Sequence, residues 1–225
     1  MAEESIVEEN LQTILSEICK SIRDSDPDIG EKQLKKRLVA NFVEYVGQNF
    51  FVEKNKELDS FLKDGNKSIK EELNGFSRTY FLERINKNDE IDYLGFVTIR
   101  IFNLDISDVD IKIKKKLILS GKSPKNIDCI PCYLIEQVAK NSNVEDNPIG
   151  AKDLLDLAMG KIIQSNNLLG SALVTLLGVN IDKVINIYSE YGFEKFGELK
   201  TPSGSTVSYQ PMYLKLPTGI DSLCQ

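Results

Sequence analysis

The stretch from residue 130 to residue 193 limits the possible folds more than any other part of this sequence. It begins with an apolar, β-prone run at 130–139 that suits a strand. A loop with a proline and a glycine follows, and apolar residues then recur at helical spacing up to Ile163. After a turn expected at 166–170, a second strand at 172–178 leads into a helix that should end at Gly192. This order predicts a βαβα motif.

The loop of this motif opens onto a helix N-terminus. Unpaired backbone N–H groups and the helix dipole both favour negative charge there, so the loop suits a ligand that carries phosphate. The two common nucleotide fingerprints, GxGxxG and GxxxxGK[ST], are both missing from the sequence. Simple nucleotide binding is therefore the less favoured interpretation.

Composition excludes several classes of function. The 225 residues are 41% hydrophobic, enough for one well-buried domain or for one domain with an appendage. A net charge of −6 argues against a strongly basic nucleic-acid binder. Because the chain has no histidine, His-based triads and zincin sites are excluded, and we expect no metal.

The cysteines and the N-terminus point to a reduced, cytoplasmic protein. Cys129 and Cys132 form a CxxC without the second pair that a zinc site needs, so we expect all four cysteines, with Cys19 and Cys224, to have packing roles. The N-terminus is acidic and lacks the apolar region of a signal peptide. No apolar run approaches the roughly 18 residues of a membrane span, so no membrane association is expected.

Two amphipathic helices are expected before the main sheet, at 4–23 and 34–46. They could form a hairpin packed on the domain, or offer their apolar stripes to a second copy or a partner protein. For residues 38–46 a first strand of the sheet is the alternative. A third helical segment covers 56–72.

Strands at 76–85 and 93–102, joined by a turn at 87–90, predict an antiparallel hairpin. Two further strands are expected at 194–200 and 208–216, and the tail from 217 should be disordered. The polar connection at 105–125 carries a run of lysines that is either a solvated face or a patch for an anionic substrate such as RNA. These are Lys112, Lys114, Lys115, Lys116, Lys122 and Lys125. We therefore predict a mixed α/β fold with a mostly antiparallel sheet.

With these elements in order, the chain resembles the GNAT (GCN5-related) N-acetyltransferases, nearest the branch of bacterial and phage acetyltransferase toxins. The matching motifs are LDSFL (58–62), SRTY (77–80), LGFVTI (94–99), IPCYLIEQVAKN (130–141), IGAKDLL (149–155) and IYSEYGF (187–193). The resemblance implies a GNAT domain at 48–217, a helical N-terminal extension at 1–47 and a flexible tail at 218–225.

The resemblance also implies an acetyl-CoA site between the fourth and fifth strands. Backbone groups of Val138, Ala139 and Lys140 would bind pantetheine and polarise the thioester carbonyl. The pyrophosphate would bind the loop and helix start at Gly150, Ala151 and Lys152. The loop departs from the family pattern of Arg or Gln, two residues, Gly, one residue, and Gly or Ala, because Glu145 and Pro148 occupy its first two defined positions.

Two residues are the candidates for catalysis. Tyr188 matches the tyrosine of the family's last motif and would protonate the leaving thiolate, whereas spacing alone favours a core tyrosine. Tyr191 is the competing phenol. Glu136 is the only carboxylate in its apolar stretch and is the candidate base, with a solvent-facing role or a water relay as alternatives.

The resulting hypothesis is an acetyl-CoA-dependent N-acetyltransferase that transfers the acetyl group directly to a primary amine of a small molecule, a protein or an aminoacyl-tRNA. No covalent acyl-enzyme is expected, since no cysteine or serine lies beside a plausible base. The alternative is a non-catalytic GNAT-like module that binds a partner protein through its N-terminal helices.

Overall fold

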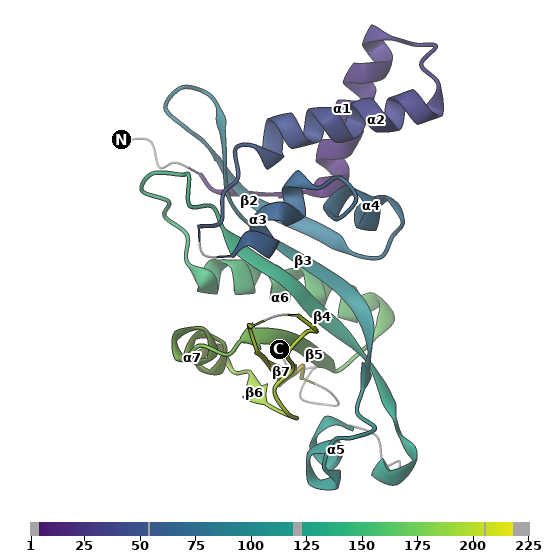
Figure 1. Cartoon of the computed structure of the whole chain (residues 1–225), viewed down its shortest axis with the longest axis vertical. Coiled ribbons are helices and arrows are strands. Elements are labelled where there is room, and N and C mark those ends of the chain that lie inside the picture. Colours follow the sequence, from purple (N-terminus) through teal and green to yellow (C-terminus); the bar gives the residue numbers. More distant parts are fainter. Residues whose placement is uncertain (1–4, 54, 119–122, 205, 218–225) are drawn as a thin grey trace. The chain divides into compact units, whose positions relative to one another are not determined.

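The computed structural model describes residues 5–53, 55–118, 123–204 and 206–217 (Figure 1). The chain forms two compact units, each built from two chain segments. The first unit contains Met1–Ile99 and Gln137–Ala158, and the second contains Arg100–Glu136 and Met159–Gln225. The predicted tail at 218–225 lies outside the described residues, and the domain boundaries at 47 and 217 stay predictions.

The strands form one hydrogen-bonded order, β1-β2-β3-β4-β5-β7-β6. The pairs β1–β2, β2–β3, β5–β7 and β6–β7 are antiparallel, and β4–β5 is parallel. The predicted class, a mixed α/β fold with a mostly antiparallel sheet, is therefore confirmed. No helix among the described residues is both long and apolar enough to span a bilayer.

The first unit starts with a strand and continues with helices. Its elements are β1 (Val7–Asn10), α1 (Leu11–Ser25), α2 (Glu31–Phe42), the π-helix η1 (Val43–Gly47), α3 (Lys56–Lys63), α4 (Ser68–Leu73), β2 (Arg78–Ile85) and most of β3 (Ile91–Asp105). The predicted hairpin is confirmed, since β2 and β3 pair from Arg78↔Ile99 to Ile85↔Ile91. The helical interpretation of 38–46 is also confirmed.

The predicted helix start at residue 4 is wrong. Val7–Asn10 form β1, which pairs with β2 from Val7↔Glu83 to Asn10↔Tyr80. Asn10 then begins α1 as an extended N-cap, and its side chain accepts a 2.8 Å hydrogen bond from the Thr13 N–H. The segment at 56–72 is also interrupted, because α3 ends before an extended Asp64.

The core of the first unit buries the apolar stripes of both N-terminal helices. Leu11, Ile14, Leu15 and Ile22 of α1 and Leu34, Leu38 and Phe42 of α2 belong to one cluster with Phe81 and Phe96. The Phe96 ring lies 5.1 Å from that of Phe50 and 5.8 Å from that of Phe61. These stripes are thus occupied inside the unit, as the packed-hairpin interpretation expected.

The second unit contains the end of β3, α5 (Ile111–Leu117), η2 (Pro124–Asn126), most of β4 (Cys129–Lys140), the end of α6 (Ala151–Leu169), β5 (Leu173–Val179), α7 (Asp182–Tyr191), β6 (Glu194–Lys195) and β7 (Tyr209–Lys215). The turn expected at 166–170 is wrong, since α6 continues to Leu169. The strand expected at 194–200 is shorter, with Lys200 forming only a bridge to Tyr209. The end of α7 at Gly192 is confirmed.

Candidate functional site

The parallel ladder between β4 and β5 is short. Tyr133, Leu134 and Ile135 pair with Val174, Thr175 and Leu176, although both strands continue further. Beyond Leu176, β5 still pairs with β7 through Val179, but these residues are not part of the β4–β5 ladder. The end of β4, which holds the candidates Val138, Ala139 and Lys140, therefore lies outside that ladder.

Asn141 fixes the chain where β4 ends and the loop begins. Its side chain is 1% exposed and makes four hydrogen bonds. The amide nitrogen donates to the carbonyls of Asn49 (3.0 Å) and Tyr93 (2.8 Å). The amide oxygen accepts from the backbone N–H groups of Phe51 (3.1 Å) and Asn143 (3.0 Å). One buried side chain thus ties the loop to two other segments of the first unit.

The start of α6 is exposed and carries free donors as well as a carboxylate. The Leu154 N–H bonds the Gly150 carbonyl at 3.4 Å, so the N–H groups of Ala151, Lys152 and Asp153 precede the first intrahelical bond. The Gly150 N–H is already occupied, because it donates to Asp153 Oδ2 at 2.6 Å. An anion at this helix end would compete with the Asp153 carboxylate for one donor.

Gly95 allows this helix start to lie close to β3. A Cβ atom at position 95 would be 2.8 Å from Ile149 Cδ1, 2.9 Å from the Ala139 carbonyl oxygen and 2.9 Å from Leu154 Cδ2. Only a glycine fits this approach without movement of the backbone oxygen. Lys140 adds a further tie, since its Nζ donates to the Asn147 carbonyl at 2.9 Å. Glu145 and Pro148 lie exposed in the same loop.

Tyr188 lies on α7 with its ring against the backbone of β5. A Cβ at Gly178 would be 3.2 Å from Tyr188 Cδ2 and 3.3 Å from its Cε2. The ring also meets that of Phe193 in a T-shaped arrangement, with centroids 6.2 Å apart. Burial raises the pKa of the half-buried Tyr188 phenol. Such a phenol keeps its proton at neutral pH and can act as an acid.

Glu136 lies in an ion pair on β4. Its Oε1 is 3.5 Å from Nη1 of Arg100, and the two side chains are 22% and 30% exposed. The Arg100 guanidinium also lies 5.5 Å from the centroid of the Phe102 ring. If Glu136 acts as a base, its carboxylate must accept a proton while it lies beside the positive charge of Arg100.

The predicted site residues fall into two groups. Val138, Ala139, Lys140, Gly150, Ala151 and Lys152 belong to the first unit, and Glu136 and Tyr188 belong to the second. Four residues that position them were missed: Asn141, Asp153, Gly178 and Arg100. A polar residue directly after a strand and a glycine inside an apolar strand were the available signals for Asn141 and Gly178.

One cysteine and one lysine of the predicted run are buried, whereas Cys129, Lys112 and Lys115 are exposed. Cys132 is buried, and burial raises the pKa of its thiol to about 12. In the predicted lysine run, Lys114 is buried and donates to the Ser107 carbonyl at 2.9 Å, and Lys116 lies 3.7 Å from Glu194. Lys122 and Cys224 lie outside the described residues.

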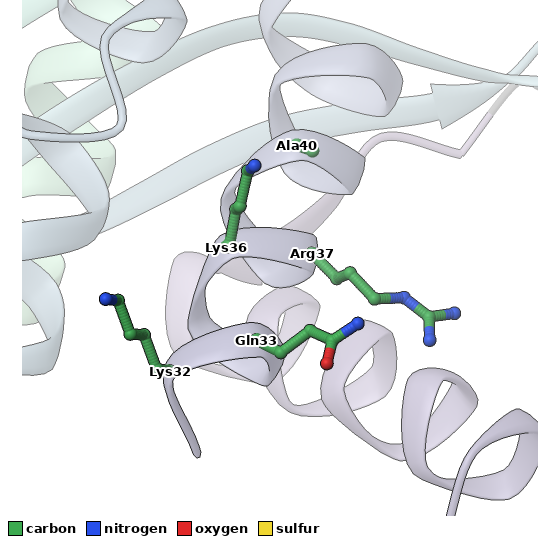
Figure 2. A pocket seen from close by; sticks show the side chains of 5 residues that line it. All are labelled: Lys32, Gln33, Lys36, Arg37 and Ala40. Carbon is green, nitrogen blue, oxygen red and sulfur yellow. The ribbon is translucent and has the colours of Figure 1, made fainter. Parts of the chain in front are cut away.

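A hollow on α2 is lined by cations but holds none of the predicted site residues. Lys32, Gln33, Lys36, Arg37 and Ala40 surround it (Figure 2). Its volume is about 530 Å³. Arg37 pairs with Asp26 at 3.3 Å, while Lys32 and Lys36 are exposed, so this face of the helix could attract an anionic partner.

No family model and no curated protein match the sequence. Solved structures do match the fold. A bacterial toxin is 18% identical with a TM-score of 0.60, covering 95% of this chain and 92% of its own. AtaT complexed with acetyl-methionyl-tRNAfMet is 16% identical with a TM-score of 0.54, covering 92% and 94%.

A Tyr-to-Phe mutant of KacT is 16% identical with a TM-score of 0.52, covering 77% of this chain and 91% of its own. At such identities the likeness concerns the fold. The order from β4 through α6 and β5 to α7 is the βαβα order that the sequence predicted. The chain therefore has the GNAT acyltransferase fold, in the form shared by the AtaT and KacT toxins.

Proposed function

We propose that this protein is an acetyl-CoA-dependent N-acetyltransferase that transfers the acetyl group directly to a primary amine. The observation that carries the proposal is the position of Tyr188, whose ring lies on Gly178 at the end of β5 with a protonated phenol. Structures of this fold support the cofactor, since AtaTR was solved with acetyl-CoA.

Acetyl-CoA would supply an activated acetyl group as a thioester. Backbone N–H groups of Ala151 and Lys152, with the Lys152 side chain, would bind its pyrophosphate at the start of α6. The backbone of Val138, Ala139 and Lys140 would bind the pantetheine arm and stabilise negative charge on the carbonyl oxygen. The residues fit this group on one condition: the anion must share or displace the contact between Asp153 and Gly150.

Proton transfer would be handled by two side chains. The amine must lose a proton as the new C–N bond forms, and Glu136, directly or through water, is the candidate acceptor. The C–S bond breaks, and the phenol of Tyr188 returns one proton to the departing sulfur. Burial raises the pKa of this phenol, so the phenol is protonated at neutral pH, although the higher pKa also makes it a weaker acid.

The variant Tyr188→Phe tests the proposal. We expect turnover to fall about 100-fold or more, a usual general-acid contribution, with little change in acetyl-CoA affinity. Tyr191→Phe is the matched control, because it removes a phenol from the same helix and should leave turnover near wild type. Full activity in Tyr188→Phe would refute the assignment.

For the acceptor, we favour the amine of an aminoacyl-tRNA. AtaT of the same fold was solved with acetyl-methionyl-tRNAfMet, and exposed lysines of α2 could contact phosphates. A mobility shift with charged tRNA should weaken steeply as salt rises. A salt-independent shift, or none, would instead favour small or protein amines.

The second candidate is a non-catalytic module that binds a partner protein or a second copy through the N-terminal helices. Asp153 and Glu145 favour it, because both place negative charge where the pyrophosphate would bind. AtaT was solved with the C-terminus of its antitoxin AtaR, which supports a protein partner. Calorimetry decides: no heat with acetyl-CoA at about 1 mM favours this module. A cytoplasmic location stays a prediction.

A further inference from the structure

A groove on the first unit lies between α1, α4 and the start of β2. Its lining residues come from 12–24 on α1, from Leu38 on α2 and from 72–78, where α4 leads into β2, so all of them belong to the first unit. Its volume is about 750 Å³, compared with about 530 Å³ for the hollow on α2. None of the residues predicted for catalysis or cofactor binding lines this α1–α4 groove, so it is a separate surface.

The floor of the α1–α4 groove is apolar. Leu15 and Leu38 line it and are buried, with exposed fractions of 4% and 7%. Leu73 also lines it but is 51% exposed, and Phe76, which follows shortly along the chain, is 63% exposed. Exposed apolar side chains beside a hollow are typical of a surface that contacts another molecule. An occupant with an apolar group would remove part of this surface from water.

Arg78 is held at the groove by one of its guanidinium nitrogens. Its Nη1 donates to the carbonyls of Glu72 (3.1 Å) and Ser77 (3.0 Å) and lies 3.1 Å from Glu72 Oε1. Glu72 is fixed in turn, because its Oε2 accepts the Thr79 N–H at 3.0 Å. Nε and Nη2 of Arg78 form no hydrogen bond with the described residues, and the side chain is 43% exposed. A guanidinium so placed keeps two donors for a carboxylate, which can accept parallel hydrogen bonds from both.

Two further cations line the groove from α1. Lys20 and Arg23 are exposed and form no ion pair with any described carboxylate. The lining also holds the carboxylates of Asp24 and Glu72, and Glu72 is already engaged by Arg78. The groove therefore favours a single carboxylate near Arg78, whereas a strand of phosphates would also meet Asp24 and Glu72.

We propose that the α1–α4 groove binds an acidic segment of a partner protein. An apolar side chain of this segment contacts Leu15, Leu38 and Leu73, and a neighbouring carboxylate binds Arg78. The cations of α1 attract the segment electrostatically. A nucleic acid fits less well, because its phosphate backbone offers no apolar group to the exposed Leu73. The inference gives a surface and a partner chemistry to the second candidate function, and it also holds for an active enzyme because no acetyl transfer is involved.

The probe is a fluorescently labelled peptide of the sequence Gly-Ser-Leu-Glu-Leu-Glu-Ser-Gly. The same peptide with glutamine in place of glutamate tests the charge, and labelled oligouridylate tests the nucleic acid. Binding to the full chain is measured by fluorescence anisotropy at one salt concentration and without acetyl-CoA, so failure of this inference is distinguishable from failure of the proposed acetyl transfer. We expect saturable binding of the glutamate peptide, at least about ten-fold tighter than that of the glutamine peptide or the RNA.

Ser16→Trp fills the groove without changing its charge. Ser16 is an exposed lining residue whose hydroxyl donates to the Gln12 carbonyl of the same helix at 2.8 Å. We expect this variant to keep the melting temperature of wild type and to bind the glutamate peptide at least about ten-fold more weakly. Ser21→Trp is the matched control, because Ser21 is an exposed serine of α1 outside the groove lining and should bind as wild type does.

Arg78→Lys keeps the positive charge beside Glu72 but removes the planar fork, so binding should weaken several-fold while the chain stays folded. Arg23→Gln removes a charge from the groove and should also weaken binding, whereas Lys35→Gln, at an exposed position of α2 outside it, should not. The proposal is overturned if the glutamate peptide shows no saturable binding, or if the glutamine peptide or the RNA binds at least as tightly. It is equally overturned if Ser16→Trp binds the glutamate peptide as tightly as Ser21→Trp.

Discussion

At Gly178, the backbone of β5 approaches side chains of α7 so closely that an added methyl group would make tight contacts. A Cβ there would lie 3.1 Å from Ile185 Cδ1 and 3.2 Å from Tyr188 Cδ2. An alanine there would press on both the Ile185 side chain and the Tyr188 ring. The Tyr188 ring thus lies close to a position that carries no side chain.

Gly178→Ala is therefore expected to lower turnover by about ten-fold or more while leaving acetyl-CoA affinity close to wild type, with an overpacking cost of about 1–3 kcal/mol. Steady-state kinetics, calorimetry and urea denaturation measure these quantities. Gly160→Ala on α6 is the control, because no atom lies within 4 Å of its added Cβ. Equal kinetics in both variants would show that the ring position does not matter.

At the scale of elements, Asn141 joins the end of β4 to the segments at Asn49–Phe51 and Tyr93. Asn141→Ala would leave buried backbone groups without partners, at about 1–3 kcal/mol each before relaxation. We expect a loss of about 3 kcal/mol or more in the free energy of unfolding, measured by urea denaturation. Ser142→Ala is the control, since its exposed hydroxyl accepts only one long bond of 3.4 Å. A small loss would mean that water replaces the amide.

At the N-terminus of α6, one substitution is expected to raise CoA affinity and to lower stability. Asp153→Asn removes a negative charge beside the Gly150 N–H, so CoA should bind about 2–5-fold more tightly, while the free energy of unfolding should fall by about 0.3–1 kcal/mol. Asp182→Asn removes the acidic residue of the first turn of α7 and should lower stability alone. Unchanged CoA affinity in Asp153→Asn would place the pyrophosphate elsewhere.

Local pattern explains which elements were predictable. The hairpin, β5 and the end of α7 followed from alternation, apolar runs and Gly192. β1 was missed because Val7 continues the helical spacing of α1, and only pairing with distant β2 makes it a strand. The turn at 166–170 was wrong because Asn166, Asn167 and Gly170 are typical turn residues, although the helix continues through most of them. The resemblance, rather than spacing, singled out Tyr188.

For the whole molecule, stability should depend on pH through carboxyls with raised pKa values. Burial raises the pKa of Glu83 and that of Glu72, the latter despite its Thr79 and Arg78 partners. The folded state therefore holds these protons more tightly than the unfolded state, so their effect on the free energy of unfolding becomes less favourable as pH rises through the folded pKa.

We expect the stability gained by Glu83→Gln over wild type to grow as pH rises above about 4.3, the ordinary glutamate value, and to level off once Glu83 is ionised. Urea denaturation at a series of pH values measures this difference. Here Glu9, Glu17 and Tyr93 are the facing titratable groups. A difference that stays constant with pH would contradict the raised pKa.

Because each compact unit is assembled from two separate stretches, a chain shortened at either end is not expected to keep both units intact. A chain beginning at residue 48 would lose β1, α1 and α2, uncovering Phe81 and Phe96 and freeing one side of β2. Such a fragment should aggregate through its free strand edge and its exposed aromatic residues. A loss of activity in a shortened protein would therefore say nothing about catalysis.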